Sequence, residues 1–557
     1  MATINPATQS YVDALVAARK AEYAKVRTYR DYADGDHQDY MTDEQRILLV
    51  GEDGAGNPNT APELRINIST PILDAETDRL EVKNIAVTVE DNEALSDELS
   101  GLVWDRWQAS RMDEGQQNVH FGACRDANSY IVVYWDDRSE QARLAFNRAY
   151  DGDSSGTEML YQDDDPNQPI CAVKIWTVQR PVVGNASVGR VQRKNVYYED
   201  HVEKWINTNA EGVFSAAAWR PLQQGDPDWE DGLLSGTFTD AYGNQYAATF
   251  QWWTDTGQEG GEPLGIPVFH FRHQGRGSAY GRSTLADVVP GVQDSINIAS
   301  LSLLAATVLN GSKVTTATNF DPSSTSTLSV YPGAILYNTQ DGTFGQLSET
   351  DLRQLIEVKD SLIKDAATLT STPLSFFNLT GVVPAEGTQK QLEISLLAKT
   401  RRNQTSFGNS YEDAVRMLLK LEAVYGSEVT LSLEDIDALD ISVEWEDANP
   451  RNEAEVLDGA IRRHKELQTP REVAWSEAGY SPDEIEAMRE DLDTRRNQAM
   501  GELLSGLMEA ENAQDVPPNG APVAVQEQEH GLVEGNAGQN PNGRTDSAAS
   551  AAGARGA

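Results

Sequence analysis

The sequence has little cysteine, little positive charge and no long apolar run, and each shortage excludes a class of protein. Cys124 and Cys171 are its two cysteines, too few for a disulfide framework, and neither stands in a metal-ligand pattern. No apolar run reaches the roughly 18 residues of a transmembrane helix, so we expect no such helix and no membrane partner. The first residues lack the basic and apolar regions of a secretory signal. We therefore expect the chain to be made and kept in a reducing cytoplasm.

Positive charge is scarce because 45 Lys and Arg face 87 Asp and Glu, which gives a net charge of −42. A protein that grips nucleic acid gains affinity from cations that neutralise phosphates, and this chain does the opposite on average. Two interpretations stay open: the acidic surface serves solubility, or it tolerates DNA nearby without holding it.

Catalytic and phosphate-binding motifs are also lacking. Residues 381–390 resemble a phosphate-binding loop, but five residues separate the glycines and no Lys-Ser/Thr pair follows. Residues 275–281 miss the dinucleotide fingerprint by one position. Asp163, Asp164 and Asp165 predict a solvated acidic loop rather than a cation site. We therefore expect no enzymatic activity and no cofactor.

His270 and His273 are the remaining candidates for metal ligands, because two histidines three positions apart can share an ion. No cysteine or third histidine lies nearby in the sequence. We therefore predict a structural role for both histidines and no metal site.

The fold predicted from periodicity is α+β, organised around residues 284–425. Ser283 can cap a short leading turn, and a long apolar-faced helix follows. A second helix starts at Ser348 and ends before Pro373, and a third spans about 386–425. The predicted apolar face of the second helix consists of Leu352, Leu355, Ile356, Leu362, Ile363 and Ala366.

A small β insert is predicted between the first two long helices. Asp341-Gly342 is a strong hairpin signal, and it would join strands at 334–337 and 343–347. Each flanking helix would span about 35–40 Å, and two such rods do not close a core alone. They are either an ordinary helical layer of a globular domain or elements that pack against copies of themselves.

The flanking parts alternate between helical and extended patterns. Helices are predicted at 7–32, 93–119 and 454–466, and at Thr469-Pro470 and Ser481-Pro482, where proline suits a first turn. Strands are predicted at 82–90, 127–136 and 441–445, and residues 140–270 are β-rich with a topology that periodicity does not show. From about residue 513 the composition predicts disorder.

Six short stretches occur in an order that resembles bacteriophage portal proteins, the head-to-tail connectors of long-tailed siphophages. The most specific is 281–297, which resembles the start of that family's first stem helix. The others are 29–35, 67–80, 126–133, 370–373 and 449–453.

The resemblance implies a ring of twelve subunits with four kinds of domain. The expected parts are a wing at 1–281 and 390–448, a two-helix stem at 282–312 and 348–373, a β-containing clip at 313–347, a tunnel loop at 374–389, a helical crown at 449–512 and a disordered tail at 513–557.

The resemblance also implies a function and a set of site residues. The ring would sit at one capsid vertex of the virion, after assembly in the host cytoplasm, and conduct double-stranded DNA during packaging and ejection. Its partners would be the major capsid and scaffolding proteins, the terminase, and head-completion or adaptor proteins. The tunnel-loop residues would be Asn378, Thr380, Gly381, Val382, Val383 and Pro384.

Lys359 and Lys364 are predicted to be exposed on the second stem helix. They are either ordinary solvated residues or a ring of positive charge facing the channel of the oligomer. Two other functions remain as alternatives for the whole chain: an enzymatic packaging subunit of the terminase ATPase or nuclease kind, and an unrelated acidic structural adaptor.

Overall fold

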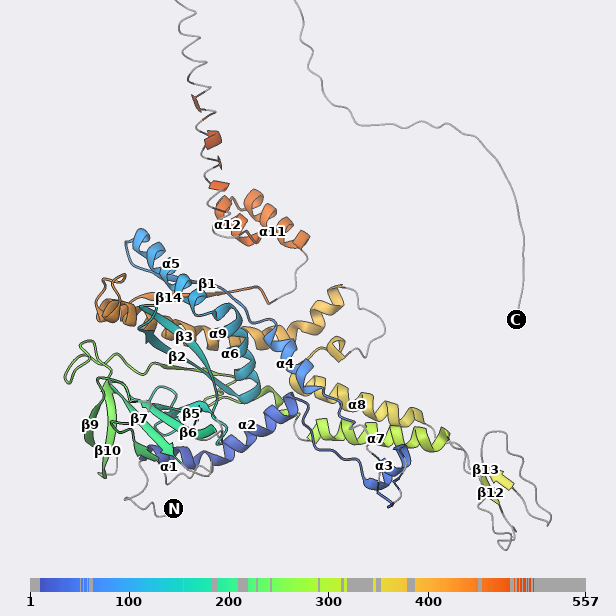
Figure 1. Ribbon diagram of the computed structural model, residues 1–557. Helices are drawn as coiled ribbons and strands as arrows, with labels where there is room; N and C mark the ends of the chain where they lie inside the picture. Colours follow the sequence, from blue (N-terminus) through green and yellow to red (C-terminus); the bar gives the residue numbers. More distant parts are fainter. Residues whose placement is uncertain are drawn as a thin grey trace, which may run out of the picture. The chain divides into compact units, whose positions relative to one another are not determined.

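A computed structural model of the protein shows an α+β fold (Figure 1). The chain divides into two compact units, residues 1–450 and 451–557. The structure describes 11–50, 64–153, 155–181, 188–208, 219–226, 229–240, 243–288, 291–311, 315–317, 344–346, 352–377, 386–448 and 453–480, with scattered residues in 52–59 and 485–504. Among these, no helix combines the length and apolarity needed to cross a bilayer.

The first unit begins with helices, and two of the helices predicted from the sequence are each divided into two shorter ones. The helix predicted at 7–32 is two helices that meet at Arg19, and the helix predicted at 93–119 breaks at Arg111, whose φ is +54°. A left-handed residue cannot continue a right-handed helix, and arginine gives no sequence signal for this conformation. The elements are α1 (Tyr11–Ala18), α2 (Lys20–Ala33), α3 (Asp43–Val50), α4 (Ser69–Thr77), α5 (Glu93–Ala109) and α6 (Met112–Asp126).

A three-stranded antiparallel sheet lies at the centre of this unit, in the order β11 (Val268–Arg272), β2 (Asn128–Asp136), β3 (Gln141–Arg148). Side chains alternate across β2, as the strand geometry requires. Ile131 and Val133 enter the main core with α5, α6 and α9, whereas Tyr130 and Val132 pack against a second sheet.

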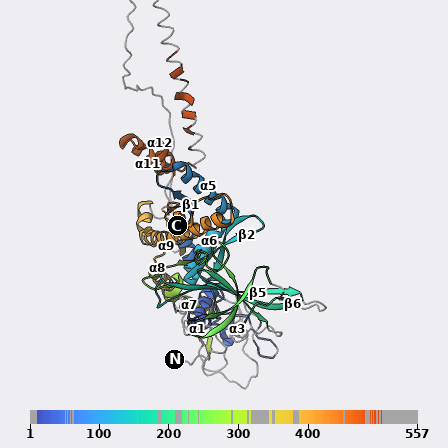
Figure 2. The same ribbon diagram turned by 90° about the vertical axis from the view of Figure 1, so that its left-hand side faces the viewer.

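That second sheet is seven-stranded and accounts for most of the β-rich region predicted at 140–270, whereas β3 and β11 belong to the three-stranded sheet. The order of the seven-stranded sheet is β4-β5-β6-β7-β10-β9, with β8 added to β7. Figure 2 shows β5 and β6 extending away from α7 and α8 on one side. The strands are β4 (Gly156–Tyr161), β5 (Pro169–Pro181), β6 (Val188–Tyr197), β7 (His201–Thr208), β8 (Trp219–Pro221), β9 (Leu234–Thr239) and β10 (Gln245–Trp252).

The two ends of the first unit meet in a short antiparallel pair, β1 (Val82–Thr88) with β14 (Asp440–Trp445). Ile85 lies opposite Val443 in this pair. The short helix α10 (Leu433–Asp437) precedes β14 and is capped by Ser432 in a capping box with Asp435.

The central stretch contains the predicted helices in the predicted order. A 3-10 turn, η2 (Thr284–Asp287), leads into α7 (Gly291–Gly311), and Figure 1 shows α8 (Leu352–Thr370) beside it. After the turn η3 (Leu374–Phe377), α9 (Glu386–Tyr425) has the predicted bounds. Ser283 caps η2 as predicted, since its Oγ accepts the Leu285 N–H at 3.0 Å.

The β insert differs from its prediction in its pairing. β13 (Phe344–Gln346) lies within the predicted strand 343–347, but it pairs with β12 (Thr315–Ala317), a strand that was not predicted. The predicted partner at 334–337 and the turn Asp341-Gly342 lie outside the described residues. Because β12 follows α7 and β13 precedes α8, the strand pair belongs to the end of the α7–α8 hairpin at which α7 ends and α8 begins.

The described part of the second unit consists of helices and short non-helical stretches at 467–470 and 478–480. It contains α11 (Glu453–Glu466) and α12 (Arg471–Glu477), and Pro470 precedes α12 as its N-cap rather than in its first turn. Every described residue from Ile485 to Leu504 is also helical. Ser481, Pro482 and the tail predicted at 513–557 lie outside the described residues.

Candidate functional site

The α7–α8 hairpin is the candidate interaction element, and a buried carboxylate anchors its base to the first unit. Glu76 of α4 is completely buried. Its Oε2 accepts from the Thr284 hydroxyl at 2.7 Å and lies 2.6 Å from the Lys399 ammonium. Its Oε1 accepts from the Asn403 amide at 2.6 Å. One carboxylate therefore ties α4 to α9 and to the turn that opens α7.

The charge of Glu76 is held in place by its neighbours. Burial alone raises the pKa of this carboxyl, but the adjacent His273 and Lys399 outweigh burial, so the pKa lies well below its usual range. His273 places Nε2 at 2.9 Å from Glu76 and Nδ1 at 2.5 Å from the Arg282 carbonyl oxygen. Each ring nitrogen of His273 therefore has a polar partner.

The same cluster contains a possible set of metal ligands that the sequence did not suggest. One ligand atom each from Glu76, Cys124 and His273 lie within 4.8 Å of one another. No sequence pattern connects Cys124 with these groups, and the fold brings it beside Glu76 and His273. However, Lys399 already supplies the cation, and burial raises the pKa of the Cys124 thiol, which opposes the thiolate that a metal requires. The arrangement fits an internal ion network better than a metal centre.

His270 lies in a different environment from His273, so the two histidines do not face a common site. Its Nδ1 lies 2.7 Å from the Tyr161 hydroxyl and its Nε2 lies 2.8 Å from the Asn128 side-chain oxygen. Burial lowers the pKa of His270 well below its usual value, which keeps the ring neutral. Its contacts are those of a structural residue.

A second polar layer holds α7 farther along the helix. The buried amide of Gln293 accepts from the Ile68 N–H at 3.1 Å and donates to the Ile66 carbonyl. The buried Asn297 accepts from the Ile66 N–H at 3.0 Å. These two side chains satisfy backbone groups of a segment that belongs to no sheet. Gln293 and Asn297 are four residues apart on an otherwise apolar helix face, and this spacing is a sequence signal that a search for apolar residues alone does not detect.

An apolar stripe runs along α8 beside its buried face. Val358 is 53% exposed and Leu369 is 51% exposed, and helical geometry places both on one side of α8, with Leu355 and Leu362 between them and the core. On α7, Ile298 is 46% exposed. Ile356, predicted to be buried, is 45% exposed, because the face it shares with Ile363 is covered only near the base of the hairpin. The first unit alone leaves the stripe uncovered.

The predicted channel-facing lysines lie on α8 at different levels of exposure. Lys359 is half-buried and Lys364 is exposed. Five positions correspond to about 140° around a helix, so the two ammonium groups point to different sides of α8. The six predicted tunnel-loop residues, Asn378, Thr380, Gly381, Val382, Val383 and Pro384, lie outside the described residues.

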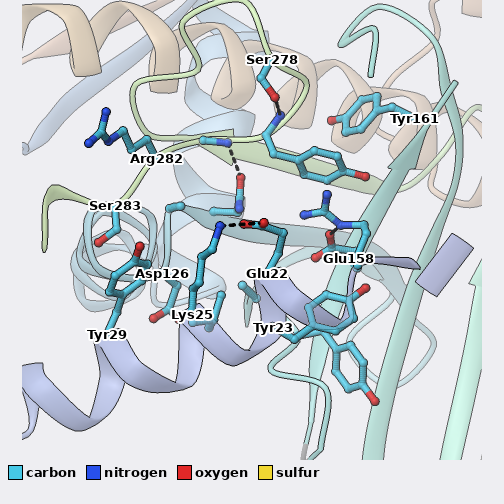
Figure 3. Close-up of a pocket in the computed structure, with 18 of the residues that line it drawn as sticks. Glu22, Tyr23, Lys25, Tyr29, Asp126, Glu158, Tyr161, Ser278, Arg282 and Ser283 are labelled. Atoms are coloured by element: carbon cyan, nitrogen blue, oxygen red, sulfur yellow. Dashed lines mark hydrogen bonds and ion pairs between the residues drawn. The ribbon is translucent and has the colours of Figure 1, made fainter. Parts of the chain in front are cut away.

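A cavity of about 790 Å³ lies between α1, α2, β4 and the loop that precedes η2 (Figure 3). Inside it, the Arg19 Nε donates to Glu158 at 2.5 Å, and the guanidinium stacks 3.2 Å above the ring of Tyr280. The partly buried arginine and the buried carboxylate neutralise each other. The lining also contains one hydroxyl beside a carboxylate, Ser278 next to the exposed Asp164.

The glycine and aspartate motifs of this region have structural explanations. A Cβ on Gly281 would lie 2.0 Å from the Ala127 carbonyl oxygen, so close backbone packing, rather than a nucleotide, requires this glycine. Asp164 is exposed, but it also accepts hydrogen bonds from the Ser278 hydroxyl and the Ala279 N–H, at 3.1 Å each.

Comparison of the sequence with protein-family models and with curated proteins finds no significant match.

Proposed function

We propose that this chain is the subunit of a viral portal ring, which conducts DNA through one capsid vertex. The proposal joins the order of the six sequence motifs to one structural observation. That observation is the α7–α8 hairpin with the strand pair β12–β13 at its far end, which corresponds to the stem and clip expected from the resemblance.

The uncovered stripe on α8 supports self-association of this hairpin. Burial of a whole Val or Leu side chain contributes about 1.5–3 kcal/mol, and Val358 and Leu369 are each about half exposed. Covering the remaining surface therefore contributes about 1 kcal/mol per side chain and per copy. A closed ring covers the stripe of every subunit, because each copy presents the same surfaces to its neighbours.

The charge of the chain supports a conduit rather than a clamp. Twelve chains at −42 each carry a total charge of about −500. A bore that shares this negative charge repels a polyanion from all sides, which centres the DNA and lowers friction. In this proposal the ring conducts DNA without binding it, carries no enzymatic activity, and offers β12–β13 for docking of the terminase and later of head-completion proteins.

Negative-stain microscopy with mass measurement of the purified full chain tests the proposal. Twelve chains of 61.0 kDa should give hollow rings of about 730 kDa. A strict monomer at high protein concentration, a solid particle without a bore, or ATP hydrolysis by the chain alone would contradict it. ATP hydrolysis would favour the terminase-like alternative.

A further inference from the structure

The second unit contains an apolar groove between α11 and α12, here called the α11–α12 groove. Its volume is about 390 Å³, and it is lined by Leu457, Ile461, Trp475 and Tyr480, with the basic side chains Lys465 and Arg471 also in its lining. Leu457 is 48% exposed, Ile461 40% and Tyr480 41%, so large side chains that usually form a core are open to solvent here.

The groove has a charge opposite to that of the chain. No Asp or Glu lines it, although acidic residues outnumber Lys and Arg by 87 to 45 in the whole sequence. Lys465 and Arg471 are exposed, and neither forms an ion pair within the part of the chain that the structure describes. An apolar floor with basic side chains at its edge favours an apolar helix that carries negative charge.

The chain itself contains a segment with this chemistry at residues 500–511. Met500, Leu503, Leu504, Leu507 and Met508 recur at the spacing of one helical face. In a helical projection of the sequence, Glu511 falls on the apolar face, seven residues after Leu504, whereas Glu502 and Glu509 fall on the opposite side. No Lys or Arg occurs in the segment.

The described part of this segment is not covered by the groove of its own chain. Met500 is 53% exposed and Leu504 is 55% exposed. Leu492 lines the groove, and the described residues between it and Leu504 are helical.

We propose that the α11–α12 groove binds the acidic apolar segment 500–511 of a second copy of this chain. The contact is head-to-tail, because the groove of one copy receives the segment of the next, so each copy both gives and receives. The proposal rests on the chemistry of the second unit and does not require that the assembly conduct DNA.

Cysteine cross-linking in the full chain tests this contact, because the two native cysteines are buried. The double variant Ile461→Cys, Leu504→Cys is oxidised with oxidised glutathione and run on a denaturing, non-reducing gel. We expect a ladder of covalent dimers and larger multimers that reduction collapses to monomer. The matched control is Arg462→Cys, Leu504→Cys, since Arg462 is exposed on α11 but does not line the groove. It should give at least tenfold less multimer.

Charge reversal provides the second measurement. In the cross-linking variant, Lys465→Glu with Arg471→Glu should lower the multimer yield at least tenfold, and adding Glu502→Lys, Glu509→Lys and Glu511→Lys should restore it. Thermal unfolding within a few degrees of the parent establishes that each variant folds.

Three outcomes overturn the inference: an intrachain disulfide without multimers, equal yields at positions 461 and 462, and no restoration by the reversed segment. A multimer ladder from particles that have no bore would leave this inference intact and contradict the portal proposal. The two proposals can therefore fail separately.

Discussion

At the scale of single residues, two buried ionisable groups in the first unit have opposite charge states. Glu76 is kept ionised by two neighbouring basic side chains. His120 is kept neutral by its complete burial, although its Nδ1 lies 2.9 Å from the Leu80 carbonyl oxygen; its Nε2 lies 3.1 Å from the Tyr411 hydroxyl. Burial lowers the pKa of His120 to about 3. Each of these charge states gives a test.

Replacing Glu76 by Gln should destabilise the folded chain by about 3 kcal/mol, because Lys399 would lose its buried counter-charge and His273 a carboxylate partner. Urea denaturation at pH 7 and one protein concentration measures the change. Since the pKa of Glu76 is depressed in the folded state, this stabilisation is present above about pH 4.3 and lost as the pH falls toward the folded value. Glu98→Gln, on the exposed face of α5, should change stability by less than about 0.5 kcal/mol. If both variants lost the same free energy of unfolding, Glu76 would not anchor the base of the hairpin.

Because His120 is neutral in the folded chain, we expect the free energy of unfolding to fall with pH in a higher pH range than the one in which Glu76 acts. The unfolded chain binds a proton at this ring below about pH 6.5 and the folded chain does so only near pH 3, so stability falls by about 1.4 kcal/mol per pH unit between these values. His37 and His270, whose pKa values burial also lowers, act in the same direction. Denaturation of His120→Gln at pH 8, 6.5 and 5 should therefore show a shallower pH dependence than the parent, whereas parallel curves would show that His120 contributes nothing to it.

At the scale of elements, the exposed stripe on α8 is the surface through which the hairpin should associate. Val358→Asp with Leu369→Asp places two charges on it and should abolish large assemblies while the subunit still folds, because a buried carboxylate without a partner opposes association. Thr368→Asp, on the other flank of the same helix, is the matched control and should assemble normally. Light scattering after size exclusion measures both. Assembly of the stripe variant at the parental mass would contradict the role of α8.

Elements that are determined by their local sequence could be predicted, whereas elements that depend on residues far apart in the chain could not. The bounds of α9 follow from the sequence because forty residues carry one uninterrupted helical period. The break at Arg111 does not, because a single left-handed arginine has no local signal. The pairing of β13 with β12 depends on residues 27 positions or more apart, which periodicity cannot link. The Glu76 cluster was not predicted for the same reason, since its members come from α4, η2, α9 and the loop after β11.

At the scale of the whole molecule, the portal proposal divides the chain into parts that assemble and parts that do not. Truncation after residue 512 should leave ring formation unchanged, because the composition of 513–557 offers few apolar residues to bury. Microscopy of the truncated chain checks this, and a loss of rings would contradict the predicted disorder of the tail.

Substitutions in the tunnel loop test how the assembled ring handles DNA. Val382→Asp with Val383→Asp should leave rings intact and change DNA retention or packaging, because the loop is proposed to project uncharged side chains into the channel. Particle yield and DNA content per particle are the measurements. If both are unchanged, the loop has no part in DNA movement.

The pairing of β1 with β14 has a consequence for synthesis of the protein. The strands are joined by residues 89–439, so β1 leaves the ribosome well before its partner exists. At about 5–20 residues per second this delay is about 20–70 s. During that time the apolar side of β1, with Ile85 and Val87, has no β14 to pair with, and an unpaired strand of this kind is prone to intermolecular aggregation. Expression should therefore give more native protein at low temperature or with added chaperones, which shield nascent chains until residue 445 has emerged.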